Sequence, residues 1–306
     1  MLYQEVRPKT FDDVFGCKSA VTALRRAVES ENRSHVYLLH GPSGCGKTTL
    51  ARVFAVAIGA DDFNVIERNA ASERGIDMAR RIERQAQTPP LSGGVRVDII
   101  DECHAITSDG QSCLLKVLED VSEYQYYCLC TTHPQKLREA IRTRCEEITV
   151  SPLDEDDLIE LVLDASAKGG LKDPGDKVLD AIAENSDGCP RRAIVLLEKQ
   201  DGLEEDEALS VVRSHKSLEK ATMDLCRAML GKPWRVVMST YNALEDKDAE
   251  KIRRFVLGYL AGCLKKAKKP EEAERFTEMI EELADARYDA GTPGLLAQLY
   301  RANTVK

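Results

Sequence analysis

Residues 41–48 read Gly-Pro-Ser-Gly-Cys-Gly-Lys-Thr, and this stretch decides the fold class. It matches the Walker A pattern G-x-x-x-x-G-K-[ST], whose glycines let backbone N–H groups surround phosphate oxygens. An apolar run at residues 36–39 precedes it, and a helical pattern over residues 48–58 follows it. A plain glycine-rich turn would need neither a strand before it nor a helix after it. The stretch therefore predicts a phosphate-binding loop that opens a helix.

The loop and a later strand supply the candidate nucleotide ligands. Lys47 would reach the β- and γ-phosphates, and the Thr48 hydroxyl would take one Mg²⁺ position. An apolar strand at residues 95–100 ends in Asp101, which would hold Mg²⁺, and Glu102, which would activate the attacking water. Taken alone, such a pair is typical of a solvated strand end, but the phosphate loop favours the nucleotide site. The loop residues predicted to bind nucleotide are Gly41, Pro42, Ser43, Gly44, Cys45, Gly46, Lys47, Thr48 and Thr49.

The pattern on both sides of the loop predicts an α/β fold with a parallel sheet. Short apolar runs alternate with helical patterns such as residues 76–87, which is typical of strands joined by crossover helices. The Thr-Pro-Pro-Leu-Ser-Gly-Gly cluster at residues 88–94 predicts a loop. The predicted strands cover residues 36–39, 64–67, 95–100, 126–130 and 147–150.

Strand signals end at about residue 151, and the rest of the chain is helical. Three amphipathic patterns follow, and from about residue 213 the pattern stays helical, with breaks predicted at residues 231–233 and 291–294. We therefore expect an α/β domain over residues 1–151, a small helical domain over 152–212 and a larger helical domain over 213–306. The three amphipathic helices are predicted at residues 154–168, 176–185 and 190–200.

Composition narrows the class of protein. The 306 residues are 43% hydrophobic and 31% charged, and no apolar run is long enough for a membrane helix, so we expect a soluble intracellular protein. The net charge of −9 argues against coating nucleic acid through bulk charge. Residues 1–150 carry only −2 of it, with 19 basic and 21 acidic side chains, so any DNA contact is expected there. The 10 cysteines form no Cys-x-x-Cys pair and are expected to be reduced and mostly buried.

Four further segments, together with the phosphate loop, carry a resemblance to a known family. From about residue 2 to 200, and more faintly to the end, the sequence resembles clamp-loader ATPase subunits of the AAA+ superfamily, above all replication factor C small subunits and their phage counterparts. The resemblance implies a P-loop parallel sheet with a helical lid and an all-helical collar that holds subunits in a ring. The four matching segments are residues 7–16, 69–77, 111–119 and 131–137.

The resemblance assigns roles to residues outside the phosphate loop. Arg7 and Val14 lie in the segment that contacts the adenine in this family. Thr132 corresponds to sensor 1, which would orient the water or the γ-phosphate. Arg144, in Thr-Arg-Cys, corresponds to an arginine finger that acts on the neighbouring subunit's ATP, and Arg191 to the sensor 2 contact with the γ-phosphate.

Three departures from the family pattern stand out. Val6 replaces the usual aromatic residue before Arg-Pro, and Thr143 replaces a serine but keeps the hydroxyl. The four-cysteine zinc module of bacterial loader subunits has no counterpart in the sequence. The sequence therefore points away from the bacterial branch and predicts no structural zinc.

The helical pattern at residues 76–87 carries a row of cations suited to DNA. Arg80, Arg81 and Arg84 lie within little more than one turn, and such a row fits sequence-independent contact with phosphates. The resemblance agrees, because this helix lines the DNA-tracking surface in clamp loaders. The alternative is a solvated face on which Arg81 pairs with Asp77 and Arg80 with Glu83.

Two more residues are candidates for coupling to DNA. Lys136 is a weaker candidate for phosphate contact. Gln111 resembles a glutamine that relays DNA contact to the ATP site, and a helix-capping role is the equal alternative.

Together these features predict an ATP- and Mg²⁺-dependent clamp-loader ATPase. ATP binding would assemble a ring, expected to be pentameric, that opens a sliding clamp, and primer–template DNA would trigger hydrolysis and clamp release. The resemblance places such a protein in the cytoplasm or nucleoid, or in the nucleus of a host cell. Two alternatives stay open: a AAA+ DNA-branch remodeller or helicase-like motor, and a nucleotide-binding subunit that never hydrolyses ATP.

Overall fold

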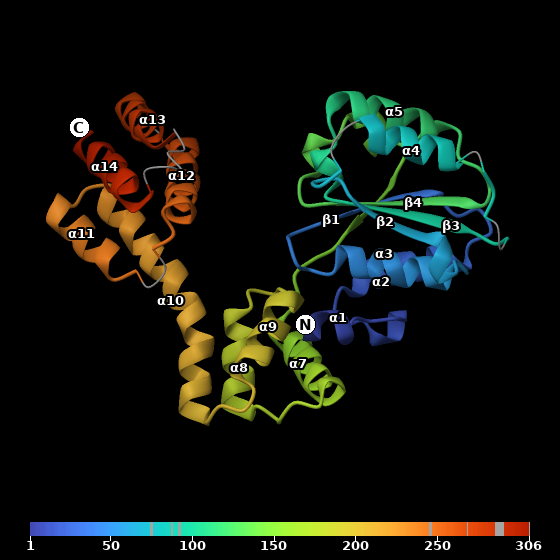
Figure 1. The fold of residues 1–306 in the computed structure, drawn as a ribbon, viewed down its shortest axis with the longest axis horizontal. Helices are drawn as coiled ribbons and strands as arrows, with labels where there is room; N and C mark the ends of the chain where they lie inside the picture. Colours follow the sequence, from blue (N-terminus) through green and yellow to red (C-terminus); the bar gives the residue numbers. More distant parts are fainter. Residues whose placement is uncertain are drawn as a thin grey trace. The chain divides into compact units, whose positions relative to one another are not determined.

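The structure is a computed structural model that describes residues 1–73, 76–86, 88–90, 93–244, 247–267, 269–284 and 291–305; the side chains of residues 76 and 214–220 are excluded. The chain divides into two compact units, Met1–Leu209 and Ser210–Lys306 (Figure 1). The finer division at residues 151 and 212 stays a prediction. Residues 74 and 75 of the 69–77 segment, and residues 91 and 92 of the predicted loop, lie outside the described part of the chain.

A five-stranded parallel sheet forms the centre of the first unit, which confirms the predicted α/β fold. The strand order is β2-β3-β4-β1-β5. The central strands are apolar because helices cover both faces, and every residue of β4 is buried. The strands are β1 (Val36–His40), β2 (Val65–Asn69), β3 (Arg96–Asp101), β4 (Gln125–Thr131) and β5 (Glu146–Thr149).

Two pairs of helices cover this sheet (Figure 1). The helices α2 (Lys18–Glu29) and α3 (Lys47–Ala57) lie on one face, where Phe54 packs with its ring centroid 4.6 Å from that of Tyr37. The helices α4 (Ile76–Ala86) and α5 (Ser108–Glu119) lie on the other face. The shorter elements are α1 (Leu2–Glu5), η1 (Phe11–Asp13), η2 (Asp62–Asn64), η3 (Cys103–Ala105), η4 (Pro134–Lys136) and α6 (Glu139–Arg142).

Three helices complete the first unit at the positions that the sequence predicted. They are α7 (Glu155–Gly169), α8 (Asp176–Asn185) and α9 (Pro190–Gln200). The Asp154 side chain caps the N-terminus of α7 by accepting the Asp157 N–H at 2.8 Å. Pro190 stands in the first turn of α9, where its missing N–H costs nothing, and the N-terminal helix α1 packs against α7 and α9.

The second unit is helical and has its own apolar core. Its helices are α10 (Glu205–Met229, which begins in the first unit), α11 (Trp234–Asn242), α12 (Ala249–Lys266), α13 (Pro270–Ala284) and α14 (Gly291–Thr304). The break predicted at residues 291–294 is wrong, because these residues form the first turn of α14. Pro293 is tolerated there since the first-turn N–H groups have no partner within the helix. None of the described helices has the length and apolar character needed to cross a bilayer.

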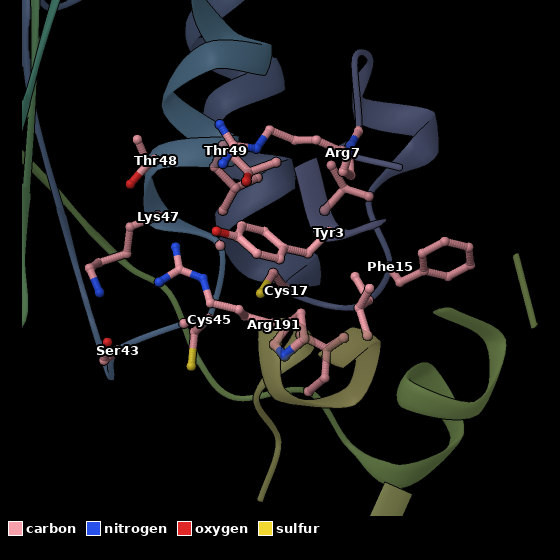
Figure 2. Close-up of a pocket in the computed structure, with 18 of the residues that line it drawn as sticks. Tyr3, Arg7, Phe15, Cys17, Ser43, Cys45, Lys47, Thr48, Thr49 and Arg191 are labelled. Carbon is pink, nitrogen blue, oxygen red and sulfur yellow. The ribbon is translucent and has the colours of Figure 1, made fainter. Parts of the chain in front are cut away.

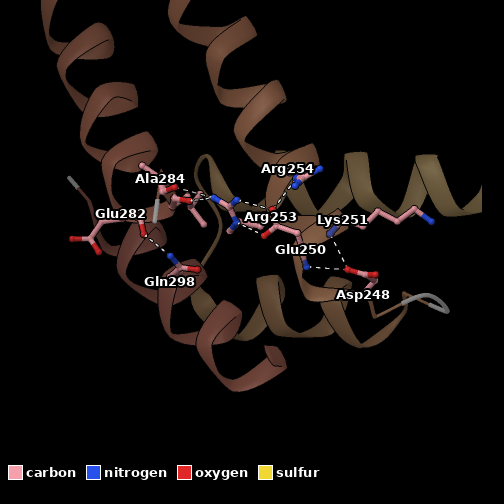
Figure 3. Close-up of polar contacts among 9 residues, drawn as sticks. Asp248, Glu250, Lys251, Arg253, Arg254, Glu282, Ala284 and Gln298 are labelled. Carbon is pink, nitrogen blue, oxygen red and sulfur yellow. Dashed lines mark hydrogen bonds and ion pairs between the residues drawn. The ribbon is translucent and has the colours of Figure 1, made fainter. Parts of the chain in front are cut away.

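A buried arginine holds the end of α13 in the second unit (Figure 3). The Arg253 side chain is 9% exposed, and its guanidinium donates to the carbonyl oxygens of Leu283 at 2.7 Å and Ala284 at 3.1 Å. It also pairs with Glu250, whose Oε1 accepts a further hydrogen bond from Arg254 at 2.7 Å. We call these five residues the Arg253 junction. The junction satisfies two of the unpaired carbonyls that a helix C-terminus presents, those of Leu283 and Ala284.

Candidate nucleotide site

The carboxyl ends of the parallel strands bring the predicted site residues to one edge of the sheet. Register pairs Asn69 at the end of β2 with Asp101 at the end of β3. It also pairs His40, which leads into the phosphate loop, with Thr131 at the end of β4. Open parallel sheets bind ligands at this edge because the loops that follow the strands converge there.

The phosphate loop follows β1 and folds around the Lys47 side chain. The Lys47 ammonium donates to the carbonyl oxygens of Gly41 at 3.0 Å and Pro42 at 2.8 Å. A side chain at Gly41 would place its Cβ 2.0 Å from the Val150 carbonyl oxygen, and Gly46 has φ +94°. Both positions therefore require glycine, one for space and one for its left-handed backbone.

The predicted metal ligands lie in contact with each other. The Thr48 hydroxyl donates to Asp101 Oδ2 at 2.8 Å, and the Glu102 N–H donates to Asp101 Oδ1 at 2.9 Å. A hydroxyl and a carboxylate are the oxygen ligands that Mg²⁺ prefers, so this pair fits the expected ion. Glu102 has φ +50°, a left-handed conformation that is rare for glutamate and that accompanies the turn out of β3 into η3.

A cavity of about 290 Å³ opens beside the phosphate loop (Figure 2). Three cations line it: Lys47 from α3, Arg191 from α9 and Arg7 from the N-terminal segment. Burial, followed by the nearby Arg52 guanidinium, lowers the pKa of Arg7. Since Asp101 and Glu102 are the only carboxylates among its described lining residues, the cavity favours an anionic ligand. The remaining predicted residues that line it are Val14, Ser43, Gly44, Cys45, Gly46, Thr48 and Thr49.

The sequence did not single out the aromatic side chain in this cavity. The Tyr3 ring lines the cavity, with the Arg191 guanidinium carbon 5.5 Å from its centroid, and lies between Arg7 and Arg191 in Figure 2. Val6 also lines the cavity, although it departs from the family's aromatic residue. The sequence did offer one signal for Tyr3, namely that it is an aromatic residue a few positions before Arg7-Pro8. Asn69, which belongs to a family segment but received no role from the sequence, lines the cavity too.

Several predicted residues lie apart from the cavity lining. Gly41 and Pro42 contribute through their carbonyl contacts with Lys47, and Thr132 follows β4 without lining the cavity. Lys136 is exposed at the end of η4. Gln111 is buried and bridges α5 to that loop, since its side-chain NH₂ donates to the Ile106 carbonyl at 3.1 Å and its oxygen accepts the N–H of residue 138 at 2.9 Å.

Arg144 also lies apart from its own chain's cavity. Its side chain is 36% exposed and donates to Glu119 at 2.6 Å and to the Ala140 carbonyl at 2.7 Å. Arg144 and Glu119 are both partly exposed, and ion pairs between such side chains contribute little stability and exchange readily.

The three arginines of α4 project from its exposed face. Met78, Ala79 and Ile82 bury the opposite face in the core. Arg81 pairs with Glu73 at 2.9 Å rather than with Asp77. Within the described residues, Arg80 and Arg84 form no ion pair with a carboxylate.

Comparison with known proteins identifies relatives that are similar to this chain in sequence and in fold. The ATPase family associated with various cellular activities (AAA) matches residues 37–153. The replication factor C small subunit of Methanococcus maripaludis is 32% identical over 74% of this chain and 72% of that protein. That of Haloarcula marismortui is 36% identical over 62% of this chain and 59% of that protein, so the chain spans less than two thirds of that relative.

More distant relatives share the fold or a larger part of the chain. The DNA polymerase III subunit tau of Bacillus subtilis is 28% identical over 91% of this chain and 56% of that protein. The Thermotoga maritima RuvB Holliday junction branch migration motor aligns with a TM-score of 0.59 at 24% identity, covering 74% of this chain and 80% of that one. At this identity the structural likeness shows the fold alone.

Proposed function

The chain belongs to the replication factor C small-subunit family, and on that premise we propose that it is an ATP-hydrolysing subunit of a sliding-clamp loader. The observation that carries the proposal is the convergence of Lys47, the Thr48–Asp101 pair and Arg191 on one cavity beside Glu102. A glycine-rich loop, three cations and two carboxylates at the end of a parallel sheet suit a nucleoside triphosphate.

Each side chain has a place in hydrolysis. Lys47 and the loop N–H groups would hold the β- and γ-phosphates, and Arg191 would contact the γ-phosphate from α9. Glu102 would take a proton from water as the water oxygen bonds to the γ-phosphorus and the bond to the β-phosphate oxygen breaks, releasing ADP. Mg²⁺ held by Thr48 and Asp101 would neutralise charge on the phosphates.

Arg144 supports an assembly in which subunits complete one another's sites. Because it lies outside its own cavity and is exposed, it is available to a neighbouring subunit. In that place it would stabilise the charge that develops on the transferred phosphoryl group. Arg80, Arg81 and Arg84 would contact the phosphates of primer–template DNA, with Lys136 as a further candidate.

The decisive experiment is co-expression with a partner subunit and a sliding clamp from the same genome, followed by ATPase assays. We expect hydrolysis that rises when clamp and primed duplex DNA are both present. Absence of hydrolysis in every combination would favour a subunit that only binds nucleotide. DNA branch migration without any clamp would favour the motor alternative, which otherwise rests on a likeness of fold.

A further inference from the structure

One titratable side chain beside the nucleotide cavity has no role in the scheme above. His104 lies in η3, two residues after Glu102, and its side chain is 17% exposed. Its Nδ1 atom lies 3.3 Å from Glu102 Oε2 and 3.0 Å from the Thr131 hydroxyl at the end of β4. One ring nitrogen therefore faces two oxygens from two different strand ends.

The chemistry of these oxygens favours a proton on Nδ1 of His104. An ionised carboxylate only accepts hydrogen bonds, so a bare Nδ1 lone pair at this distance from Glu102 would be repelled. Thr131 Oγ1 already accepts the His133 N–H at 2.9 Å. Burial lowers the pKa of His104, although Glu102 opposes this effect, and a lowered pKa favours the neutral ring. A neutral ring with its proton on Nδ1 donates to Thr131 Oγ1, and the same N–H dipole lies beside Glu102 Oε2, 3.3 Å from Nδ1, which it attracts electrostatically.

The surroundings hold the ring in this orientation. The His133 ring packs edge-on against it, with the centroids 5.0 Å apart and the planes at 80°. Thr131 is fully buried and hydrogen-bonded on the β4 backbone. Glu102, by contrast, is 34% exposed and lines the cavity, so its side chain needs a partner to adopt one rotamer.

We propose that His104 is a positioning residue for Glu102: its Nδ1–H donates to Thr131 at the end of β4 and attracts the Glu102 carboxylate that lies beside it. One carboxylate oxygen, Oε2, is held 3.3 Å from Nδ1 by its attraction to the imidazole N–H, and the other stays available to accept the proton of the attacking water. This inference rests on the proposed ATP hydrolysis and assigns a role to a residue that the phosphate loop and the Asp-Glu pair do not include. Holding a general base in one rotamer raises kcat without changing how tightly ATP binds.

Two amide substitutions at His104 give a matched pair for the test. The amide nitrogen of asparagine can occupy the position of Nδ1, whereas that of glutamine reaches the position of Nε2. We expect His104→Asn to keep at least half of the wild-type kcat of the assembled loader. The kcat of His104→Gln and of His104→Ala should fall about tenfold, which is less than the loss expected when a general base is removed altogether. The ATP dissociation constant, measured on the full chain, stays within about twofold for all three, since none touches the phosphate ligands.

A second measurement detects the contact without using activity. In full chain with ¹⁵N-labelled histidine, long-range ¹H–¹⁵N spectra show which nitrogen of His104 is protonated. We expect Nδ1–H in the wild type, and a fall in the pKa of His104 in Glu102→Gln because the carboxylate that favours the charged ring is gone. An Nε2–H ring, or an unchanged pKa, would overturn the inference.

The kinetic outcomes separate this inference from the proposed function. An active wild type with His104→Gln at full rate, or with His104→Asn as slow as His104→Ala, overturns the positioning role alone. A faster His104→Ala also overturns it, because His104 would then restrain Glu102. A wild-type complex that never hydrolyses ATP overturns the proposed function and this inference with it.

Discussion

The cavity of the first unit and the Arg253 junction of the second both gather charged side chains, but they use them differently. Arg253 is buried and directs its donors to the Leu283 and Ala284 carbonyls and to Glu250. Within the described part of the chain, Arg7 and Arg191 of the cavity form no ion pair with a carboxylate, and Lys47 donates only to carbonyls of its own loop.

This difference separates a structural cluster from a binding site. A buried cation whose donors are all used by the fold leaves nothing for a ligand, and its removal exposes unpaired carbonyls. Cations that line a cavity without carboxylate partners leave donors for an anion. The rule that cations without carboxylate partners mark a binding site can be tested by substitutions in both regions and at exposed arginines elsewhere on the first unit.

Arg144 is the residue most able to break the comparison, because it has protein partners and is nevertheless proposed to act on ATP. We expect Arg144→Ala to lower ATPase activity of the assembled complex by about 10³-fold, the effect of an arginine finger, while ATP binding stays nearly intact. Steady-state ATPase assays and equilibrium ATP binding measure the two effects separately. Lys47→Ala should instead weaken binding itself, by about 10- to 100-fold for the removal of a charged hydrogen bond.

Arg142 provides the matched control for Arg144. It lies two residues earlier, is 38% exposed and pairs with Glu147 at 3.0 Å, a similar surface contact. Arg142→Ala should leave hydrolysis within about twofold, since exposed ion pairs contribute little. The proposal that Arg144 acts on a neighbouring subunit's ATP is wrong if both variants lose ATPase activity equally. It is also wrong if Arg144→Ala weakens ATP binding as much as Lys47→Ala does.

Arg253→Met tests the structural side of the comparison. Methionine keeps most of the aliphatic packing but removes the donors to the α13 carbonyls, so unfolding of the second unit should become easier by about 2–3 kcal/mol. Urea unfolding of the full chain can be followed by fluorescence of Trp234, the single tryptophan, which lies in α11. Arg254→Ala is the control, because its side chain is 68% exposed and also contacts Glu250. A shift in ATP affinity with Arg253→Met would make the junction part of the site.

Glu250 gives the same junction a pH dependence. Hydrogen bonds from Arg253 lower the pKa of Glu250 to about 2 from an ordinary value of 4.5. Because the folded pKa is the lower one, its stabilising contribution is complete above pH 4.5 and disappears as the pH falls toward 2. We expect Glu250→Gln to flatten the acid dependence of the Trp234 unfolding midpoint in this window. An identical dependence in wild type and variant would remove Glu250 from the junction's energetics.

The sequence predicted the sheet and the phosphate loop because both depend on local signals. Buried strands next to turn residues, and a loop with fixed glycine spacing, place Lys47, Thr48 and Asp101 almost without tertiary information. Tyr3 could not be placed in this way, since it reaches the cavity only because α1 packs on α7 and α9. His104 was likewise not identified from the sequence, because its contact with Thr131 joins η3 to the end of β4, two elements far apart in the chain. The alternative of a solvated face paired Arg81 with Asp77 by helical spacing, whereas its partner in the structure is Glu73, which precedes the helix.

The arginine row of α4 tests whether cations without carboxylate partners also mark a binding site on an open surface. Among the substitutions considered, its removal has the smallest expected effect, a change in the salt dependence of DNA binding. Arg80 and Arg84 are exposed and form no ion pair with a described carboxylate. Like the cavity cations, they therefore have donors available for an anion from outside the chain. Replacing both by alanine should reduce the slope of log K against log salt for primed-duplex binding by about 0.9 for each phosphate that the variant no longer neutralises. Arg26→Ala is the control, because Arg26 is exposed on α2, across the sheet from α4 (Figure 1). An unchanged slope in the α4 variant, or an equal change in the control, would show that an exposed cation without a partner is not enough to mark a DNA surface.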